Sequence, residues 1–560
     1  MVRLRSLVLA SGFTGASAIV LPLGDVGQKL IGAYDKSDFQ CDLPPVLSPD
    51  GDKVASADSL FSSKQALKKQ VERHQAIVRV PSVCWDDMGS LETDERWLPF
   101  RDLYPVLEKN YPNLHKRAKV EKINTFGLLY TIQGSDTSQK PILLTAHQDV
   151  VPVADESTWT HPPFEAHYDG EWLWGRGADD DKNSLTGIVS AIDALAAQSD
   201  WKPKRTILVA LGYDEECAGR RGAGPISDLL TARYGNDSIA IVLDEGGYAL
   251  NKLDDKTIYA SPAVTEKGHL DVHFELRVKG GHSSIPFPHT GIGIISEIVI
   301  ALEANPYEPG IIKNGPVYKH LVCQARYSPD AQPKIRKLLK KNDLDGLAAE
   351  FAGVSPSLRF IVQTSQAVDL ISGGVKINAM PEVVTLAVNY RVAPQDSLVE
   401  VQHNIVKIIG DIVSKYGIRV EAYKGDKEYE EHISQLNHKE LSPQSGVNYN
   451  ATLVITSRGK SNVAPESPSS GPVWDVFAGT IRHTFAFEDG TVVPVPDVLT
   501  GNTDTRHYLH LSRNVYRWTP VPGREEGHMH TVDERVRMDD HLVMIKFYYD
   551  FIRNFDAAEL

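Results

Sequence analysis

The chain has 560 residues, of which 42% are hydrophobic and 24% are charged, and its formal net charge is −14. These values are ordinary for a soluble globular protein of two or three domains, and they exclude a disordered, collagenous or coiled-coil chain. Because no run of five or six basic residues is present, the sequence argues against binding to nucleic acid or to an anionic membrane surface.

The first 23 residues have the features of a secretory signal peptide. A positively charged start and a short apolar stretch are followed by small residues at positions 16–18, which match a cleavage site. Serine, glycine, threonine and proline dilute the stretch, so it makes a poor permanent membrane span. An uncleaved anchor and an ordinary N-terminal strand or helix are the alternatives. Residues 24–58 are polar and predict a loose leader.

Apolar runs alternate with amphipathic segments in the next part of the chain. Helical spacing predicts helices at 59–77 and 185–195, and continuous apolar runs predict strands at 141–146, 206–213 and 239–243. This alternation is typical of an α/β domain with a mixed, mostly parallel sheet that is covered by helices on both faces.

The pattern changes near residue 267. The expected elements, in chain order, are a strand at 270–278, a helix at 290–304, strands at 375–380 and 383–391, and a helix at 397–416. This order predicts a β-α-β-β-α-β layer, a smaller ferredoxin-like α+β unit. Residues 305–370 read as an irregular insert and residues 440–475 as a surface loop. Core-like segments follow at 476–486 and 540–555.

Histidine and carboxylate side chains gather in four clusters. Three of them follow the ends of predicted strands, and one directly precedes the helix predicted at 185–195. The clusters are His147 with Asp149, the three aspartates Asp179 to Asp181, Glu215 with Glu216, and Asp244 with Glu245. Each cluster alone is explained by a surface histidine, a helix cap or an exposed loop. Together they would meet at one sheet edge, where open α/β sheets bind ligands. Nitrogen and oxygen ligands without thiolates suit zinc, with manganese or cobalt as alternatives.

Seven motifs resemble those of the co-catalytic zinc amidohydrolases, which include carboxypeptidase S, aminoacylase and the secreted N-acyl-amino-acid hydrolases. The motifs are TAHQDVVPV, GRGADDDKNS, GYDEECAGRRGA, LDEGG, GGHSS, NTDTRHY and HMHTVDE. DDDKNS and NTDTRHY are most similar to the carboxypeptidase S branch. The resemblance implies a two-zinc carboxypeptidase that hydrolyses the C-terminal amide bond of short Gly-Xaa-type peptides through a bridging hydroxide. An N-acyl-amino-acid hydrolase and a catalytically silent zinc- or peptide-binding protein are the alternatives.

The resemblance also implies roles for the residues of the strand-end clusters. The implied metal ligands are His147, Asp180 as the bridge, Glu216, Asp244 and His530. The neighbouring candidates are Asp179 or Asp181 for the bridge, Glu245 in place of Asp244, and His528 in place of His530. Asp149 would orient His147, and Glu215 would be the general acid and base.

A second group of residues is implied to bind the substrate. Arg506 and Gly501 would hold its free carboxylate. Asn378 and Arg391 would approach it from the smaller unit. His282, which in dimeric relatives reaches a neighbouring active site, would stabilise the oxyanion. Taken without the resemblance, these residues read as ordinary loop or strand-end side chains.

The resemblance implies a division of the chain into five parts. They are a signal peptide or anchor at 1–23, a leader at 24–58, a catalytic domain at 59–267 and 429–560, and an inserted lid at 268–428. A homodimer through the lid is the implied assembly. The implied location is the secretory pathway, vacuolar or extracellular, and sequons at Asn236 and Asn450 agree with it. Membrane attachment is expected only if the N-terminal segment is retained. The four cysteines allow at most two disulfides, and Cys217 is expected to pack as a small apolar side chain.

Overall fold

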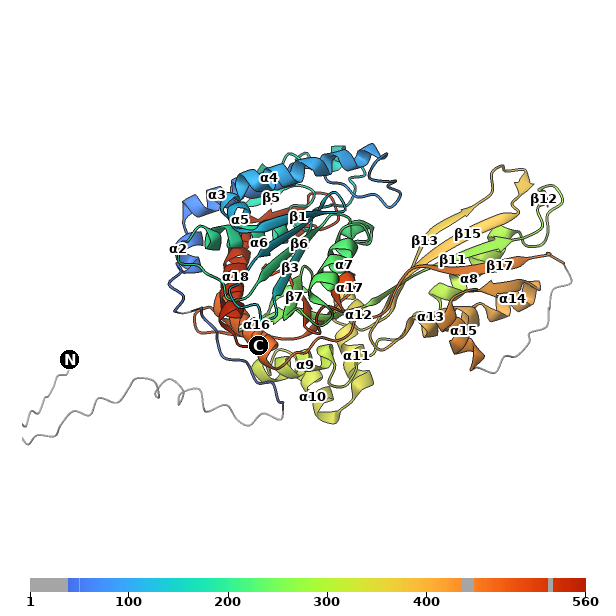
Figure 1. The fold of residues 1–560 in the computed structure, drawn as a ribbon. Helices are drawn as coiled ribbons and strands as arrows, with labels where there is room; N and C mark the ends of the chain where they lie inside the picture. Colours follow the sequence, from blue (N-terminus) through green and yellow to red (C-terminus); the bar gives the residue numbers. More distant parts are fainter. Residues whose placement is uncertain (1–38, 50, 436–447, 522–526) are drawn as a thin grey trace, which may run out of the picture.

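The computed structural model describes residues 39–49, 51–435, 448–521 and 527–560. Figure 1 shows a large α/β domain and a slender lid that projects from one side of it, joined by extended strands. The signal or anchor expected at residues 1–23 lies outside the described residues. Within the described part of the chain, no helix combines the length and the apolar character needed to span a bilayer.

The large domain is built on an eight-stranded mixed sheet. Its strand order is β1-β2-β6-β3-β7-β20-β10-β19, and the neighbours β6, β3, β7 and β20 run parallel. In that order the strands are Lys119–Ile123, Gly127–Ile132, Ile207–Gly212, Ile142–His147, Ile241–Asp244, Val515–Arg517, Ala263–Glu266 and Asp497–Leu499. The central strands are the continuously apolar segments of the sequence, which confirms the expected fold class.

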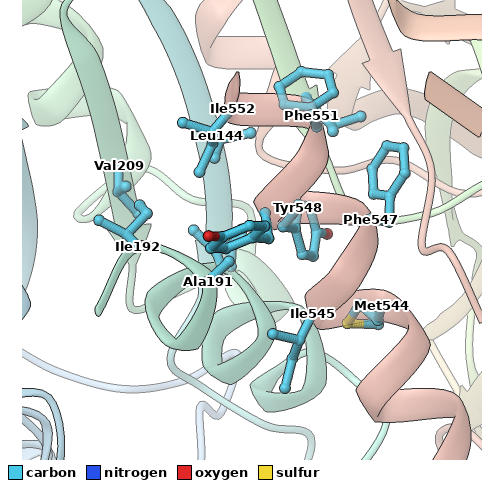
Figure 2. Close-up of a cluster of buried hydrophobic side chains, with 14 of the residues drawn as sticks. Leu144, Ala191, Ile192, Val209, Met544, Ile545, Phe547, Tyr548, Phe551 and Ile552 are labelled. Atoms are coloured by element: carbon cyan, nitrogen blue, oxygen red, sulfur yellow. The ribbon is translucent and has the colours of Figure 1, made fainter. Parts of the chain in front are cut away.

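Helices cover both faces of this sheet, because successive strand residues point to opposite sides. The covering helices include α3 (Lys64–Val78), α6 (Lys182–Ala196), α7 (Ala223–Tyr234), α16 (Pro472–Thr484) and α18 (Met538–Ala557). Leu144 and Val209 face α6 and α18, and Ala191, Ile192 and Tyr548 lie with them (Figure 2). Leu143 points to the other face and packs against α7. Fully burying one such side chain contributes about 1.5–3 kcal/mol.

The lid is a five-stranded sheet with helices against one face (Figure 1). The strand order β13-β15-β11-β17-β16 corresponds to Ser365–Gly373, Val383–Val392, Gly268–Arg277, Thr452–Ser461 and Arg419–Ala422. The helices are α8 (Gly291–Glu303), α13 (Leu398–Ile408), α14 (Gly410–Tyr416) and α15 (Lys427–Ser434). The order β11, α8, β13, β15, α13 and β17 is the expected ferredoxin-like order, and β16 adds an edge strand parallel to β17.

Two segments of the lid differ from expectation. The strand expected at 375–380 lies earlier, at β13, and Val375 and Ile377 are exposed in the turn that follows it. The surface loop expected at 440–475 contains β17, whose Leu453 and Ile455 are buried in the lid core. The polar second half of β17 masks this alternation in the sequence. Because β17 pairs with the central strand β11, we place the end of the lid near residue 461 instead of residue 428.

The insert expected to be irregular is a helical unit. Its helices are α9 (Pro316–Tyr327), α10 (Pro333–Lys341), α11 (Leu344–Ala352) and α12 (Pro356–Ile361). Their apolar side chains form one cluster that also takes in Val498 of β19, so the insert packs on the large domain. Prolines at the first turns of α9, α10 and α12 divide the segment into short helices, which hides the helical spacing in the sequence.

The described part of the leader is packed and not loose. Phe39 belongs to the core of the helical insert, and Cys41 forms a disulfide with Cys323 of α9. The Leu47 amide donates to the Gly479 carbonyl of α16 at 3.0 Å. The sequence of this polar segment has no hydrophobic periodicity, so its contacts with distant parts of the chain could not be predicted from it.

Candidate metal centre and active site

The candidate site forms where three parallel strands of the large sheet end. Strand β3 ends at His147, β7 ends at Asp244, and Glu215 lies three residues beyond the end of β6. Because these strands are parallel neighbours, their carboxyl ends meet at one edge, as expected from the sequence. His147, Asp180, Glu215 and Glu245 are buried there.

The Asp180 carboxylate lies between two histidines. Its Oδ1 is 3.1 Å from His147 Nε2, and its Oδ2 is 3.1 Å from His530 Nε2. One oxygen therefore faces each histidine, which is the arrangement a carboxylate needs to bridge two cations. The neighbouring Asp181 instead accepts from the His147 amide at 3.2 Å. This geometry favours Asp180 over its neighbours as the bridge.

A second carboxylate completes the surroundings of each histidine. Glu216 Oε1 lies 3.1 Å from His530 Nε2, and Glu245 Oε1 lies 3.4 Å from His147 Nε2. The described residues thus form two adjacent groups that share Asp180. The possible ligand atoms of His147, Asp180 and Glu216 lie within 4.8 Å of one another, and so do those of His147, Asp181 and Glu245. These two sets have His147 in common. His528 bonds instead to the Val532 carbonyl.

The structure places Glu245, and not Asp244, beside His147. Asp244 Oδ1 accepts from the Glu245 amide at 3.0 Å, and its Oδ2 is buried without a hydrogen-bond partner in the described part of the chain. Adjacent residues at a strand end project in opposite directions, so only one of the two carboxylates reaches this histidine. The resemblance implies Asp244 as the ligand, but this geometry favours Glu245 as the candidate beside His147.

This assignment gives a first testable prediction. Glu245→Gln is expected to lower the affinity of the metal beside His147 at least 10-fold, because one anionic ligand is lost. The matched variant Asp244→Asn is expected to keep two metals per chain. Metal counting by mass spectrometry after dialysis at a fixed free-metal concentration separates the two. Metal loss from the Asp244 variant alone would reverse the assignment.

Two buried carboxylates hold the ligands in place. Asp149 Oδ1 lies 3.3 Å from His147 Nδ1, as expected from the sequence, and the same carboxylate accepts from the amides of Glu215 and Glu216 at 3.1 and 3.0 Å. Glu534 accepts from the amides of Asp179 and Asp180 at 3.0 and 3.1 Å and from Arg176 at 2.6 Å. Glu534 is not among the strand-end clusters of the sequence, although it stands four residues after His530.

A disulfide fixes the segment that carries the two glutamates. Cys217 directly follows Glu216 and is bonded to Cys84. The expectation that Cys217 is an unpaired apolar side chain is therefore wrong. Its partner lies 133 residues earlier in the chain, so no local spacing signals the pair.

The buried acids need positive charge. Burial is the main cause that raises the pKa of Glu215 well above its usual value, and repulsion from neighbouring acids adds to it. Burial also raises the pKa of Glu216 to about 7, although its hydrogen bond to His530 acts in the opposite direction. Burial and the adjacent Glu245 raise the pKa of Asp244 to about 7. Divalent cations would relieve this repulsion. Two imidazoles and three carboxylates are also the donor types that zinc, manganese and cobalt accept, so the residues fit a two-metal centre.

A cavity of about 1390 Å³ opens beside the acids and extends between the large domain, the lid and the helical insert. Arg506 and Gly501 line it from the large domain and Arg391 lines it from the lid. Arg506 Nη2 lies 3.5 Å from Glu215 Oε1, and its buried Nε has no hydrogen-bond partner within the described residues. Arg391 donates to Asn502 Oδ1 at 2.9 Å. Arg506 thus lies beside Glu215, and Arg391 lines the same cavity, so two guanidinium groups are available to bind a carboxylate.

His282 and Asn378 do not reach this cavity in the same chain. His282 lies in the short strand β12 (Gly281–His282) at the far tip of the lid (Figure 1). The neighbouring Ser283 amide donates to the Asn378 carbonyl at 3.3 Å, and both His282 and Asn378 are exposed. The expectation that Asn378 lies near the substrate therefore fails within one chain.

Comparisons with known proteins agree with this geometry. Residues 143–554 match Peptidase family M20/M25/M40. The chain is 39% identical to an uncharacterized carboxypeptidase of Schizosaccharomyces pombe, covering 93% of this chain and 85% of that one. It is 36% identical to carboxypeptidase S of Saccharomyces cerevisiae, covering 91% and 89%. It is 30% identical to the mouse N-fatty-acyl-amino acid synthase/hydrolase PM20D1, covering 90% and 89%.

Solved structures share the fold at low sequence identity. The dipeptidase Dug1p from Saccharomyces cerevisiae matches with a TM-score of 0.61 and 13% identity, covering 90% of this chain and 99% of that one. Human carnosine dipeptidase 1 matches with a TM-score of 0.59 and 14% identity, and the match also covers 90% of this chain and 99% of that one. The two-domain arrangement of catalytic unit and lid is therefore common to these proteins.

Proposed function

The chain belongs to Peptidase family M20/M25/M40, a family of metallopeptidases, and we propose that it is a two-zinc carboxypeptidase acting on short peptides with a free C-terminal carboxylate. One observation carries the proposal: Asp180 joins two histidine–carboxylate groups beside Glu215, and Glu215 stands next to Arg506. An acid, a metal-binding set and a carboxylate anchor thus lie in one cavity. Zinc is our choice of metal because the ligands are imidazole and carboxylate; cobalt or manganese would suit the same set.

When bound, the two metal ions polarise the scissile carbonyl and lower the pKa of the attacking water. His147, Asp180 and Glu245 would hold one ion, and His530, Glu216 and the shared Asp180 would hold the other. Glu215 takes a proton from the attacking water at its carboxylate. It then delivers that proton to the nitrogen of the leaving amino acid.

The remaining residues orient the reacting groups. Asp149 fixes the ring of His147 from its Nδ1 side and fixes the backbone of Glu215 and Glu216. Arg506 and Arg391, with Gly501 leaving room beside them, would bind the free carboxylate of the substrate, so that the scissile bond lies against Glu215. Positioning of this kind turns a bimolecular step into an effectively unimolecular one.

The carboxylate anchor gives a second prediction. Arg506→Ala is expected to raise KM or lower kcat, so that kcat/KM for a peptide with a free C-terminal carboxylate falls about 10²-fold, because a charge-assisted hydrogen bond is lost. C-terminally amidated peptides, which cannot use the guanidinium in this way, should be affected little. Steady-state kinetics on matched free and amidated substrates measure the difference. An equal loss on both would remove Arg506 from the anchoring role.

An N-acyl-amino-acid hydrolase is the second candidate, and the cavity supplies an observation for it. Phe351, Val354, Leu358 and Ile361 of the helical insert line the same cavity as the acids. An apolar wall suits a hydrophobic acyl group or side chain on the amino side of the scissile bond. The relative PM20D1 carries the name of an N-fatty-acyl-amino acid synthase/hydrolase. A catalytically inactive binding protein is the weakest candidate, because such a protein needs no general base and does not account for the buried Glu215.

One experiment tests these functions together. Hydrolysis of benzyloxycarbonyl-Gly-Leu is measured beside hydrolysis of an N-fatty-acyl amino acid, with and without a chelator, on protein whose metal content is counted. Chelator-sensitive cleavage of the dipeptide with two zinc ions bound is the expected result. A preference for the acyl substrate would keep the chemistry and change the substrate class. Metal-loaded protein that cleaves neither would overturn the proposal.

We also propose that the chain forms a homodimer through the lid. Strand β13 is the outer strand of the lid sheet and carries exposed Leu370 and Ile371, and Ile300 of α8 is exposed nearby in the lid. An unpaired apolar edge strand is a ready surface for a second copy. In a dimer of this type, His282 at the tip of the lid would reach the partner's site, which is the role that the resemblance implies.

The dimer gives a third prediction. Leu370→Asp is expected to convert a dimer into a monomer in sedimentation velocity, because it buries a charge in the interface. The control Leu98→Asp, at an exposed leucine of the large domain, should leave the assembly unchanged. A wild-type chain that sediments as a monomer at micromolar concentration would end the proposal.

The cysteine pairing supports a location in the secretory pathway, in the vacuole or outside the cell. All four cysteines form disulfides, Cys41 with Cys323 and Cys84 with Cys217. Such bonds persist in oxidising compartments and are rare in the cytosol. The sequon residues Asn236 and Asn450 are exposed, as glycosylation requires. Mass spectrometry of protein made in a eukaryotic host would show whether these asparagines carry glycans and whether the N-terminal segment is removed.

A further inference from the structure

A second group of metal-ligand side chains lies in the large domain, outside the cavity. His161, Glu165 and His167 each offer one ligand atom, and these atoms lie within 4.8 Å of one another. None of the three lines the substrate cavity, and none belongs to the two groups that contain His147. We propose that His161, Glu165 and His167 form a third site for a zinc-type divalent cation.

The two histidine rings are stacked face to face. Their centroids are 3.9 Å apart and their planes differ by 17°. A ring nitrogen binds a metal in the plane of its own ring, so one ring has to turn before both nitrogens reach one ion. Donor atoms on a tetrahedral ion with bonds of about 2.1 Å lie about 3.4 Å apart, and the ligand atoms of the three side chains lie within 4.8 Å of one another. His161 and His167 are half-buried and Glu165 is exposed, so this turn meets little packing resistance.

The backbone that carries the three side chains is fixed. His167 lies in β4 (His167–Tyr168), which pairs with β5 (Trp172–Trp174). Between the ligands, the Glu165 amide donates to the Pro162 carbonyl at 3.0 Å, and the Ala166 carbonyl accepts from Gln75 at 2.8 Å. His161 is held on its other side by an edge-to-face contact with Trp174 at 5.3 Å. Folding has therefore already ordered the backbone that carries these side chains, so binding an ion loses less conformational entropy.

The ligand atoms of the group are available. In the portion of the chain that the structure describes, no hydrogen bond involves the ring nitrogens of His161 and His167 or the carboxylate of Glu165. Two imidazoles and one carboxylate are a donor set that zinc accepts, with the fourth position left for water. One carboxylate and one divalent ion together carry a net positive charge. Water can solvate that charge because the site is partly exposed.

The position of the group suggests what the ion would do. Thr160, next to His161, binds the Asp533 carboxylate through both its amide and its hydroxyl, each at 2.7 Å. Asp533 lies three residues after His530, a ligand of the proposed catalytic centre. An ion at the third site would therefore stiffen the segment that holds the His530 loop in place. This inference does not depend on which substrate the enzyme hydrolyses.

The test counts metals on the full-length, metal-loaded protein. Zinc alone is titrated into protein that holds its two catalytic metals, using calorimetry and mass-spectrometric metal analysis. The expected result is a third zinc per chain in the wild type and two in His161→Gln and His167→Gln, with a Kd at least 10-fold weaker in Glu165→Gln. The control His510→Gln, at an exposed histidine outside the group, should still bind three.

Two readouts separate the site from a general loss of structure. Hydrolysis of the blocked dipeptide should be unchanged in every variant at low free zinc. Added zinc should raise the Tm of the wild type and of the His510 variant, and not the Tm of the His167 variant. A wild type that stops at two metals would overturn the proposal, as would a third zinc that survives in the His161 and His167 variants.

Discussion

Replacing Glu215 by glutamine is expected to lower kcat at least 10²-fold while two metals stay bound. Glutamine keeps the shape of the side chain but cannot accept the proton of the attacking water, and general base catalysis of this kind contributes roughly 10²–10⁴-fold. Glu215 is buried and lies 3.5 Å from Arg506, and it belongs to neither group of possible ligand atoms that contains His147. Its loss should therefore affect turnover and not metal content.

The measurement combines kcat on the blocked dipeptide with metal counting on the same sample. Glu156→Gln, at an exposed glutamate of the same domain, is the control and should match the wild type. Turnover close to that of the wild type in the Glu215 variant would remove the residue from the role of base. Loss of a metal would instead show that Glu215 is a ligand.

Removing the Asp180 carboxylate is expected to have the largest effect on the metal centre. Each of its oxygens faces a different histidine, so Asp180→Ala takes one ligand from both metal positions at once. Burial alone would raise the pKa of Asp180, but hydrogen bonds from His147 and His530 hold it below its usual value, so the carboxylate is anionic at neutral pH. We expect metal content to fall from two per chain toward zero and hydrolysis to fall to background.

The neighbouring Asp179 provides the control for this prediction. Asp179→Asn should keep both metals, because its carboxylate is in neither group around the histidines. Metal analysis after dialysis and hydrolysis of the blocked dipeptide are the two readouts. If the Asp180 variant kept two metals, the bridge would lie at Asp179 or Asp181.

Much of the site could be predicted because its residues directly follow or precede recognisable elements. His147 with Asp149, and Glu215 with Glu216, come after continuously apolar strands, and parallel neighbouring strands end at the same edge. Asp180 comes just before the amphipathic helix α6. These are local patterns, and the fold class follows from the same alternation of apolar strands and helices.

The choice between adjacent candidates could not be made in this way. Asp244 and Glu245 stand side by side after β7, and packing alone decides which carboxylate faces His147. The pairing of Cys84 with Cys217 likewise depends on contacts between distant segments. Strand β17 was missed because its polar half resembles a loop, although its apolar half is buried in the lid core.

By itself, the sequence determined the class of the fold, the resemblance to a metallopeptidase family and which acids and histidines are candidates for the centre. These depend on residue type and on short spacing along the chain. Only the tertiary structure decided that Glu245 and not Asp244 lies beside His147, that the insert within 305–370 contains helices that line the cavity, and that His282 lies far from the cavity of its own chain. The reason is physical: distances between segments far apart in the sequence are set by the packing of the whole core.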